Sequence, residues 1–364
     1  MCLDAPSPPN YGGAIDMYYK ISSLANAGKK IILHYFDYHK NRDVSGLESF
    51  CSEIHSYERK SFFNFRSGGL PYIIRSRKNQ SLQERLIQDN YPILLEGLHS
   101  TGMMNGLQAG RRVVIRMHND EASYYRQLAA TERNLFKSTY HAIESMLIER
   151  YMTRLARDVK IAAISESDKE TFVKIYGFHD VHFIPAFIPW QKLSSLTGKG
   201  EFCLYHGNMH VAENVAAATW LVEEVFCKVP VSFIIAGSGI PEAVIQWEKK
   251  YKNVQVINNP SVEQINHLVA SAHINILPSM NQTGVKLKLL HSLFTGRFCI
   301  TNSNGIKGTG IKDGVYVADE AADFISMIGE LFAKEFTGEM VNERAPLLKI
   351  FDNRKNAADL SALL

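Results

Sequence analysis

The sequence has 364 residues, of which 46% are hydrophobic and 21% are charged, a mixture typical of globular proteins and too apolar for a largely disordered chain. This length exceeds one ordinary core and suits two domains of about 150–190 residues each. The 40 Lys and Arg residues nearly balance the 37 Asp and Glu residues, which excludes a strong overall field that would recruit nucleic acid.

Three further features of the sequence bear on where in the cell the protein works. No apolar run reaches the roughly 20 residues of a membrane-spanning helix. Residues 1–6 contain neither a basic segment nor a long apolar stretch, so we expect a cytoplasmic protein and leave open its association with the inner face of the membrane. The five cysteines form no C-x-x-C pair, which favours reduced thiols and supports neither a disulfide framework nor a metal site.

Short apolar runs in the N-terminal half alternate with segments of helical period, as in βα units of a parallel sheet. The runs predict strands at 30–36, 93–96, 112–117 and 160–164. Apolar residues then recur every three or four positions over 121–158. An unbroken helix of that length would reach about 55 Å, so we expect a break within it.

Two prolines, Pro185 and Pro189, mark a linker between two domains, which we place at residues 1–188 and 189–345. After it, strands and helices alternate regularly. The predicted strands are 202–206, 231–236, 254–257, 274–277, 298–301 and 315–317, and the predicted helices are 213–227, 241–251, 262–271, 285–294 and 320–334. This order implies a doubly wound domain that binds its ligand at the carboxyl ends of its strands.

The segment 278–290 follows a strand and opens a helix, so its free backbone N–H groups predict a seat for a phosphate. Gly284 lets the backbone approach a ligand, and Lys286 adds a positive charge there. An ordinary helix capped by Thr283, with a lysine on its surface, explains the same residues.

Glycines also end two other predicted strands of this domain, in the turns Gly207-Asn208 and Gly237-Ser238-Gly239. A nicotinamide-binding fingerprint would need a small residue where Glu242 stands, which argues against a dehydrogenase. Both turns are therefore either ligand contacts or simply tight strand-to-helix connections.

In the N-terminal domain, Gly12 and Gly13 open the first helix, and His118 follows a predicted strand at the edge where α/β sites lie. The glycines are either a diphosphate contact or a simple turn, and His118 is either functional or structural. The sequence has no Walker A, H-E-x-x-H or G-x-S-x-G motif, so the common NTPase and hydrolase chemistries have no support.

Together these segments resemble the GT-B glycosyltransferases, in particular the family 4-like (group 1) enzymes that use nucleotide sugars. The resemblance rests on residues 8–13, 118–121, 164–168, 281–296 and 298–302. It implies an α/β fold of two Rossmann-like doubly wound domains that face each other across a cleft. It also implies that residues 346–364 form a helix crossing back to the first domain.

The resemblance further implies transfer of a hexose, with retention, from a UDP- or GDP-linked sugar to a glycan or lipid-linked glycan, without a metal or other cofactor. Its catalytic residues would be His118 and Lys286. The donor would contact Gly12, Gly13, Gly207, Asn208, Gly237, Gly239, Thr283, Gly284, Val285, Lys286, Leu287 and His291. Thr283 and His291 stand where the family often has two glutamates. A non-catalytic GT-B protein that binds a nucleotide or a partner stays open, as does a sugar epimerase or NAD-dependent enzyme on this scaffold.

Aromatic and basic residues of the N-terminal domain predict contact with a glycan or an anionic membrane, unless they belong to a solvated loop with core aromatics. They are Phe62, Phe63, Phe65, Arg66, Tyr72, Arg75 and Arg77.

Overall fold

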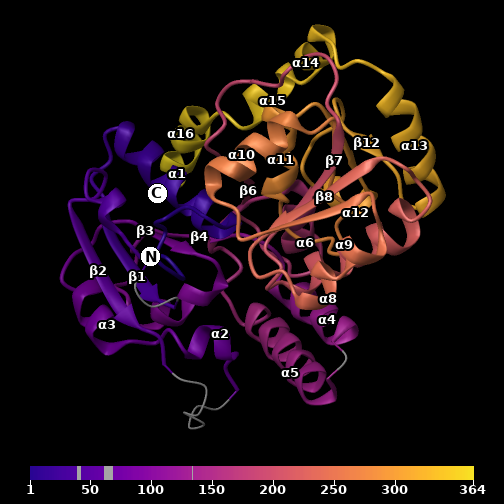
Figure 1. Cartoon of the computed structure of the whole chain (residues 1–364). Helices are drawn as coiled ribbons and strands as arrows, with labels where there is room; N and C mark the ends of the chain where they lie inside the picture. The colour runs from indigo at the N-terminus through magenta and orange to yellow at the C-terminus, as the bar shows by residue number, and fades with distance from the viewer. Residues whose placement is uncertain (39–41, 61–68, 133) are drawn as a thin grey trace. The chain divides into compact units, whose positions relative to one another are not determined.

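The computed structural model describes residues 1–38, 42–60, 69–132 and 134–364 (Figure 1). Its contacts divide these residues into two compact units. Unit 1 comprises residues 1–189, 283–285 and 351–364, and unit 2 comprises residues 190–282 and 286–350. In the part of the chain that is described, no helix is both long and apolar enough to cross a bilayer.

The strands of unit 1 are all parallel and form two sheets, with the orders β1-β2 and β3-β4-β5-β6. They are β1 (Ile32–Asp37), β2 (Glu53–Glu58), β3 (Ile93–Glu96), β4 (Val113–Met117), β5 (Lys160–Ala163) and β6 (Val181–Phe183). Sequence periodicity missed β2 and β6, because β2 is polar and β6 has only three residues before the prolines.

The first two residues of the chain join these sheets. The amino group of Met1 donates to the carbonyl of Leu94 at 2.7 Å, and its own carbonyl accepts from Glu96. Cys2 is bridged in the same way to His34 and Phe36 of β1. The chain start therefore acts as a very short central strand between β1 and β3, which gives the strand order of a Rossmann fold.

The helices of unit 1 cover both faces of its sheet. They are α1 (Gly12–Asn26), α2 (Tyr72–Arg75), α3 (Gln80–Leu86), α4 (Glu121–Thr131), α5 (Leu135–Met152), α6 (Glu166–Lys174) and α16 (Asn353–Leu363), with 3₁₀ segments at η1 (Ser45–Leu47) and η2 (Leu98–Gly106). The predicted break in the segment 121–158 is confirmed, since α4 and α5 are separate helices.

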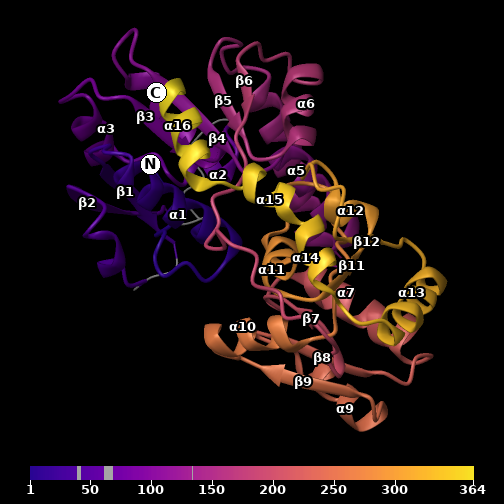
Figure 2. The ribbon, with the colours of Figure 1, turned by 90° about the horizontal axis from the view of Figure 1, so that it is seen from above.

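Alternate side chains of β4 enter the two cores of this sheet, as period two requires. Val114 packs with Leu360 of α16, whereas Ile115 packs on the other face with Phe172 of α6. Figure 2 shows α16, near the end of the chain, lying alongside α1. The last helix is thus part of the core of unit 1.

Unit 2 holds a six-stranded parallel sheet in the order β12-β11-β10-β7-β8-β9. Its strands are β7 (Phe202–His206), β8 (Ser232–Gly237), β9 (Val254–Asn258), β10 (Ile274–Ile276), β11 (Phe298–Thr301) and β12 (Tyr316–Val317). This is the doubly wound order, in which the chain changes direction between β7 and β10. Ligands of such sheets bind at the carboxyl ends of the strands beside that point.

The helices of unit 2 follow the predicted βα series. They are α7 (Ala212–Trp220) continued by the π-helical η3 (Leu221–Phe226), α8 (Glu242–Ile245), α9 (Trp247–Lys250), α10 (Val262–Ser271), α11 (Leu287–Thr295), α12 (Ser303–Ile306), α13 (Ala321–Ala333), α14 (Gly338–Glu343) and α15 (Ala345–Ile350). The helix predicted over 241–251 is two short helices. The one predicted from residue 285 begins later, at Leu287.

Candidate functional site

Glycine turns follow the two central strands β7 and β8 of unit 2, and they lie against each other. A Cβ added to Gly237 would be only 2.0 Å from the carbonyl oxygen of Gly207. No other residue fits at position 237, since the backbones are already in contact. Asn208 joins the two turns, because its side-chain oxygen accepts from the hydroxyl of Ser238 at 3.4 Å.

The turn after β8 is equally constrained. Gly239 has a φ of +68°, and a Cβ there would meet the ring of His210 at 2.4 Å. Its amide donates to Asn259 at 3.0 Å, and the amide of Ile240 donates to Asn258 at 3.1 Å. Gly207, Asn208, Gly237 and Gly239 are therefore brought together on one rim, as the sequence predicted.

The start of α11 has backbone amides that could bind an anion, but the helix begins later in the chain than the sequence predicted. The N-cap residue is Lys286, and no side chain caps the first turn, which begins at Leu287. The prediction of a helix capped by Thr283 is wrong, because Gly284 has a φ of +67° and the chain stays non-helical until Lys286. Thr283, Gly284 and Val285 group with unit 1, so their part in a donor site stays a prediction.

Lys288, in the first turn of α11, is held in place by two hydrogen bonds. Its ammonium donates to the side-chain oxygen of Asn214 at 3.0 Å and to the hydroxyl of Tyr205 at 3.2 Å. Burial, reinforced by the neighbouring Lys286, lowers the pKa of Lys288 to about 7, although Glu213 acts in the opposite direction. A bound anion would restore its charge.

His291 lies one turn further along α11, within an aromatic cluster that the sequence did not reveal. Its ring stacks on Trp190 with centroids 4.5 Å apart and meets His206 edge-on at 5.9 Å. Burial lowers the pKa of His291 to about 4, so the ring is neutral near pH 7. Nε2 of His206 is buried and makes no hydrogen bond to any described residue.

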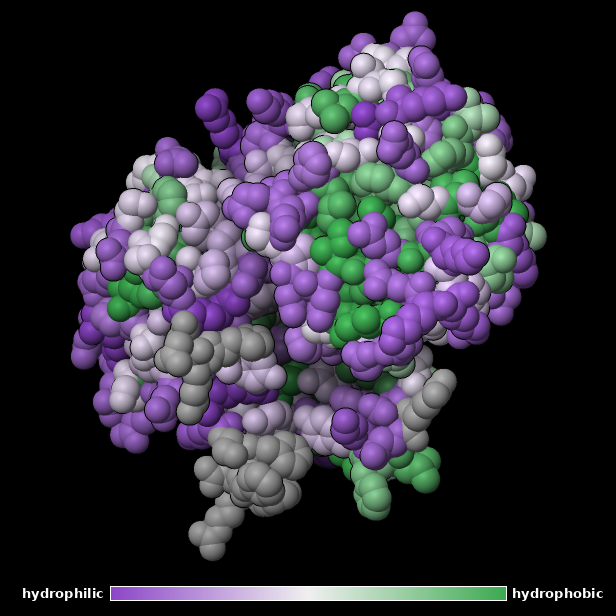
Figure 3. All heavy atoms as spheres, viewed as in Figure 1, coloured by the Kyte–Doolittle hydropathy of each residue, from purple (hydrophilic) through white to green (hydrophobic). Residues whose placement is uncertain are grey.

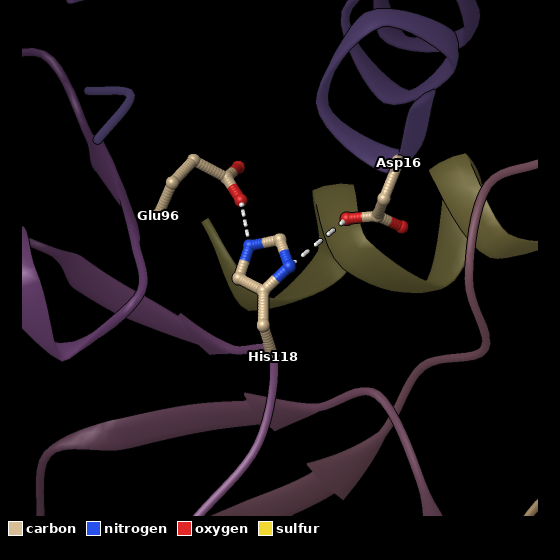
Figure 4. A group of neighbouring side chains, drawn as sticks. All are labelled: Asp16, Glu96 and His118. Atoms are coloured by element: carbon tan, nitrogen blue, oxygen red, sulfur yellow. Dashed lines mark hydrogen bonds and ion pairs between the residues drawn. The ribbon is translucent and has the colours of Figure 1, made fainter. Parts of the chain in front are cut away.

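In unit 1, His118 lies between two buried carboxylates (Figure 4). Its Nε2 is 2.9 Å from Glu96, and its Nδ1 is 4.0 Å from Asp16. A carboxylate can only accept, so Nε2 carries a proton and Nδ1 is left for another partner. Lys20 binds both carboxylates, at 2.7 Å from Asp16 and 2.8 Å from Glu96.

These charges balance within the cluster. Burial by itself would raise the pKa of Asp16, but Lys20 and Arg116 outweigh it and hold that pKa well below its usual range. Burial would likewise raise the pKa of Glu96, but Lys20 and His118 outweigh it, and the pKa of Glu96 is also lowered. Both carboxylates are thus ionised and paired, which orients the imidazole of His118.

Asp16, Glu96 and His118 also have the composition of a metal site, since one ligand atom from each lies within 4.8 Å of the others. The ammonium of Lys20 already occupies the position between the two carboxylates. A divalent cation there would have to displace Lys20, whose buried charge would then be unpaired. The cluster therefore fits a positioned histidine better than a metal centre.

Gly12 and Gly13 begin α1 of unit 1 after the N-cap Tyr11. A Cβ on Gly13 would lie 3.1 Å from the Tyr11 ring, a contact that a small movement of this side chain would relieve. Packing therefore does not by itself require glycine at position 13. Their role against a diphosphate held by the other domain stays a prediction.

The residues expected to meet a glycan or a membrane have separate outcomes. Phe62, Phe63, Phe65 and Arg66 lie outside the described residues. Tyr72 and Arg75 are partly exposed on α2. The prediction for Arg77 is wrong, because its guanidinium is buried and donates to the carbonyls of Leu3 and Ile73 at 3.1 and 2.9 Å.

Comparison with known proteins gives a family match, a protein similar in sequence and solved structures that share the fold. Residues 200–334 match the family described as Glycosyl transferases group 1. The chain is 28% identical over 334 residues to a 44.6 kDa protein in the cps region of Klebsiella pneumoniae, with 85% of this chain and 84% of that protein covered.

Two solved structures share the fold. Anabaena HepE, in complex with UDP and glucose, matches with a TM-score of 0.62 at 10% identity over 100% of this chain and 99% of its own. S. aureus TarM, in a complex that contains UDP, matches with a TM-score of 0.56 at 12% identity over 78% of this chain. The chain spans only 57% of the length of TarM. The predicted fold of two Rossmann-like domains is confirmed.

Proposed function

We propose that this chain, which has the GT-B fold and whose residues 200–334 match the group 1 glycosyltransferases, is a glycosyltransferase that moves a hexose from a nucleoside diphosphate sugar to a glycan or lipid-linked glycan. The observation that carries this proposal is the rim of unit 2. Two fixed glycine turns, the uncapped start of α11 and Lys288 meet the needs of a diphosphate: close backbone approach, amide donors and positive charge.

The donor site would use these groups for the leaving diphosphate. As the bond to the sugar breaks, negative charge grows on the diphosphate, and the amides of α11 with Lys286 and Lys288 would stabilise it. HepE and TarM were solved with UDP, which supports a UDP-linked donor, with a GDP-linked donor as the alternative. His291 would contact the ribose, where one imidazole nitrogen can accept a single hydrogen bond.

In unit 1, His118 would contact the transferred sugar or the acceptor. Glu96 and Asp16 hold its ring, and Lys20 holds both carboxylates. This pairing supports a reaction without a divalent metal, because the cluster has its own cation. We also propose retention of the anomeric configuration, as the family resemblance implies.

The acceptor is proposed from context. A relative in a cps region supports a role in envelope polysaccharide assembly, with a glycan or lipid-linked glycan as acceptor. We propose that the protein works in the cytoplasm, and that a lipid-linked acceptor would be met at the inner face of the membrane.

The test is a transfer assay with the purified chain. We would measure nucleoside diphosphate release from UDP-glucose, UDP-galactose, UDP-N-acetylglucosamine and GDP-mannose, with and without a lipid-linked glycan fraction. One donor should be consumed in an acceptor-dependent way, and Lys286→Ala should slow it at least about tenfold, the scale of one charge-assisted contact. Nucleotide binding without turnover of any donor would instead favour a non-catalytic GT-B protein.

A further inference from the structure

The most exposed large apolar side chains of the described residues stand next to each other at the start of α5. Leu135 is 81% exposed and Phe136 is 88% exposed. Their backbone is well fixed, because the side chain of Asn134 accepts from the amides of Phe136 and Lys137 at 3.0 and 3.2 Å. Two large apolar groups are therefore held in solvent by an ordered helix start, an arrangement that marks an interaction site.

The same face of α5 stays apolar for three turns. Ile143 is 51% exposed and Met146 is 70% exposed, and at 100° per residue both lie on the side of Leu135 and Phe136. Figure 3 shows apolar side chains standing out at the lower edge of the molecule, over the lower end of α5 in Figure 1. We call Leu135, Phe136, Ile143 and Met146 the outer face of α5.

The opposite side of α5 faces the protein. Glu144, Ser145, Ile148 and Met152 are buried there, and the hydroxyl of Ser145 donates to Ala122 of α4 at 2.8 Å. The exposure of the outer face is thus not a result of loose packing, since the other side of the same helix is anchored.

Basic side chains border the outer face. Arg150 and Arg154 are exposed and form no ion pair with a described residue. Glu149, in the last turn of α5, is already paired with Arg126 at 3.0 Å. An exposed apolar face with unpaired cations beside it is typical of helices that lie in the headgroup region of an anionic membrane.

We propose that the outer face of α5 is the surface by which this protein docks on an anionic lipid bilayer. The inference rests on the proposed function, since a lipid-linked acceptor has to be met at the membrane. A second copy of the chain fits less well: self-pairing would bring Arg150 and Arg154 against the partner's apolar side chains and bury their charges without acids to pair with. Anionic headgroups provide the missing partners.

The experiment is vesicle flotation of the full chain with phosphatidylglycerol/phosphatidylcholine vesicles, and with vesicles of phosphatidylcholine alone. The wild type should float with the anionic vesicles, and added salt should weaken this binding. The double variant Leu135→Ser/Phe136→Ser should lose at least about tenfold of its vesicle affinity, given the apolar area removed. Arg150→Gln/Arg154→Gln should lose binding selectively on anionic vesicles.

The matched control is Val173→Ser/Ile175→Ser, which alters two other exposed apolar residues of unit 1, of 43% and 71% exposure. It should float like the wild type. Equal loss in the control, unchanged flotation of Leu135→Ser/Phe136→Ser, or no flotation of the wild type would overturn the proposal. A concentration-dependent dimer that this variant abolishes would assign the face to a second copy instead.

Transfer to a detergent-solubilised acceptor separates the two proposals. If Leu135→Ser/Phe136→Ser keeps this activity but does not float, both proposals hold and the variant is folded. If the wild type is active but does not bind vesicles, only the membrane proposal fails. If it binds vesicles yet turns over no donor, only the proposed function fails.

Discussion

Lys288, at the start of α11, should make donor binding dependent on pH. Burial lowers the pKa of Lys288 to about 7, so in the free protein this side chain changes its charge within the physiological range. A bound diphosphate favours the charged form and raises that pKa. The affinity should therefore be constant below pH 6, where Lys288 is already charged, and should fall as the pH rises above 7.

The size of the effect follows from the fraction that is charged. With a pKa of about 7, roughly nine-tenths of Lys288 is protonated at pH 6 and about one-tenth at pH 8, which predicts a roughly tenfold loss of affinity. At pH 8, binding should take up about 0.9 proton for each ligand bound.

The assay is calorimetric titration with UDP-glucose, whose diphosphate has no monoester group that titrates near pH 6. Repeating it at pH 8 in buffers of different ionisation enthalpy measures the proton uptake. Lys288→Arg should keep the affinity and remove the pH dependence, because a guanidinium stays charged. Lys288→Met should bind weakly at every pH. A wild-type affinity that is flat between pH 6 and 8, with no proton uptake, would show that the charge of Lys288 does not govern donor binding.

Glu96→Gln should lower kcat by about 10–100-fold, because it loosens the imidazole of His118 that Glu96 holds. The nucleotide affinity should stay within about twofold of the wild type. A loss of affinity that matches the loss of kcat would count against a positioning role. Gly237→Ala should lower the free energy of unfolding by about 1–3 kcal/mol through its clash with Gly207, whereas Gly329→Ala, which meets no atom within 4 Å, should not be destabilising. Burial, with the neighbouring acids, raises the pKa of Glu121 to about 8, above its unfolded value. The stabilising contribution of this group is therefore complete at acid pH and is lost as the pH rises toward 8, by up to about 1.4 kcal/mol per pH unit. Glu121→Gln should flatten this part of the profile of unfolding free energy against pH.

The βα order of unit 2 could be predicted from the sequence because its strands are buried on both faces. The runs 202–205 and 298–300 are continuously apolar, and they fall within β7 and β11. Helix starts were less predictable. Thr283 looks like a cap, but the positive φ of Gly284 delays the helix to Leu287, and such a backbone choice leaves no signal in hydrophobic periodicity.

The surroundings of His118 could be predicted only in part. Glu96 ends a buried strand that pairs with β4, so its carboxylate stands at the same edge as His118. The position of Glu96 at the end of a predicted strand could therefore have identified it as a neighbour of His118. Asp16 and Lys20 gave none, because a pair four residues apart on a helix is usually a surface pair; only the fold shows them buried beneath the histidine.

The stack of His291 on Trp190 was not predictable for a related reason. Trp190 lies in the segment assigned to the linker, and its contact with α11 depends on how the chain enters unit 2. No local pattern links the two positions. The sequence did place His291 on the correct helix, so its substitution for the family's glutamate could be stated before its neighbours were known.

The most direct test of the central claim is calorimetric titration of the purified chain with UDP, GDP and NAD, with Lys286→Ala as the matched variant. One diphosphate nucleotide should bind, and its binding free energy should weaken in the variant by about 1–3 kcal/mol, the scale of a charge-assisted hydrogen bond. Tight binding of NAD, with no binding of UDP or GDP, would contradict the assignment of a nucleotide-sugar donor site.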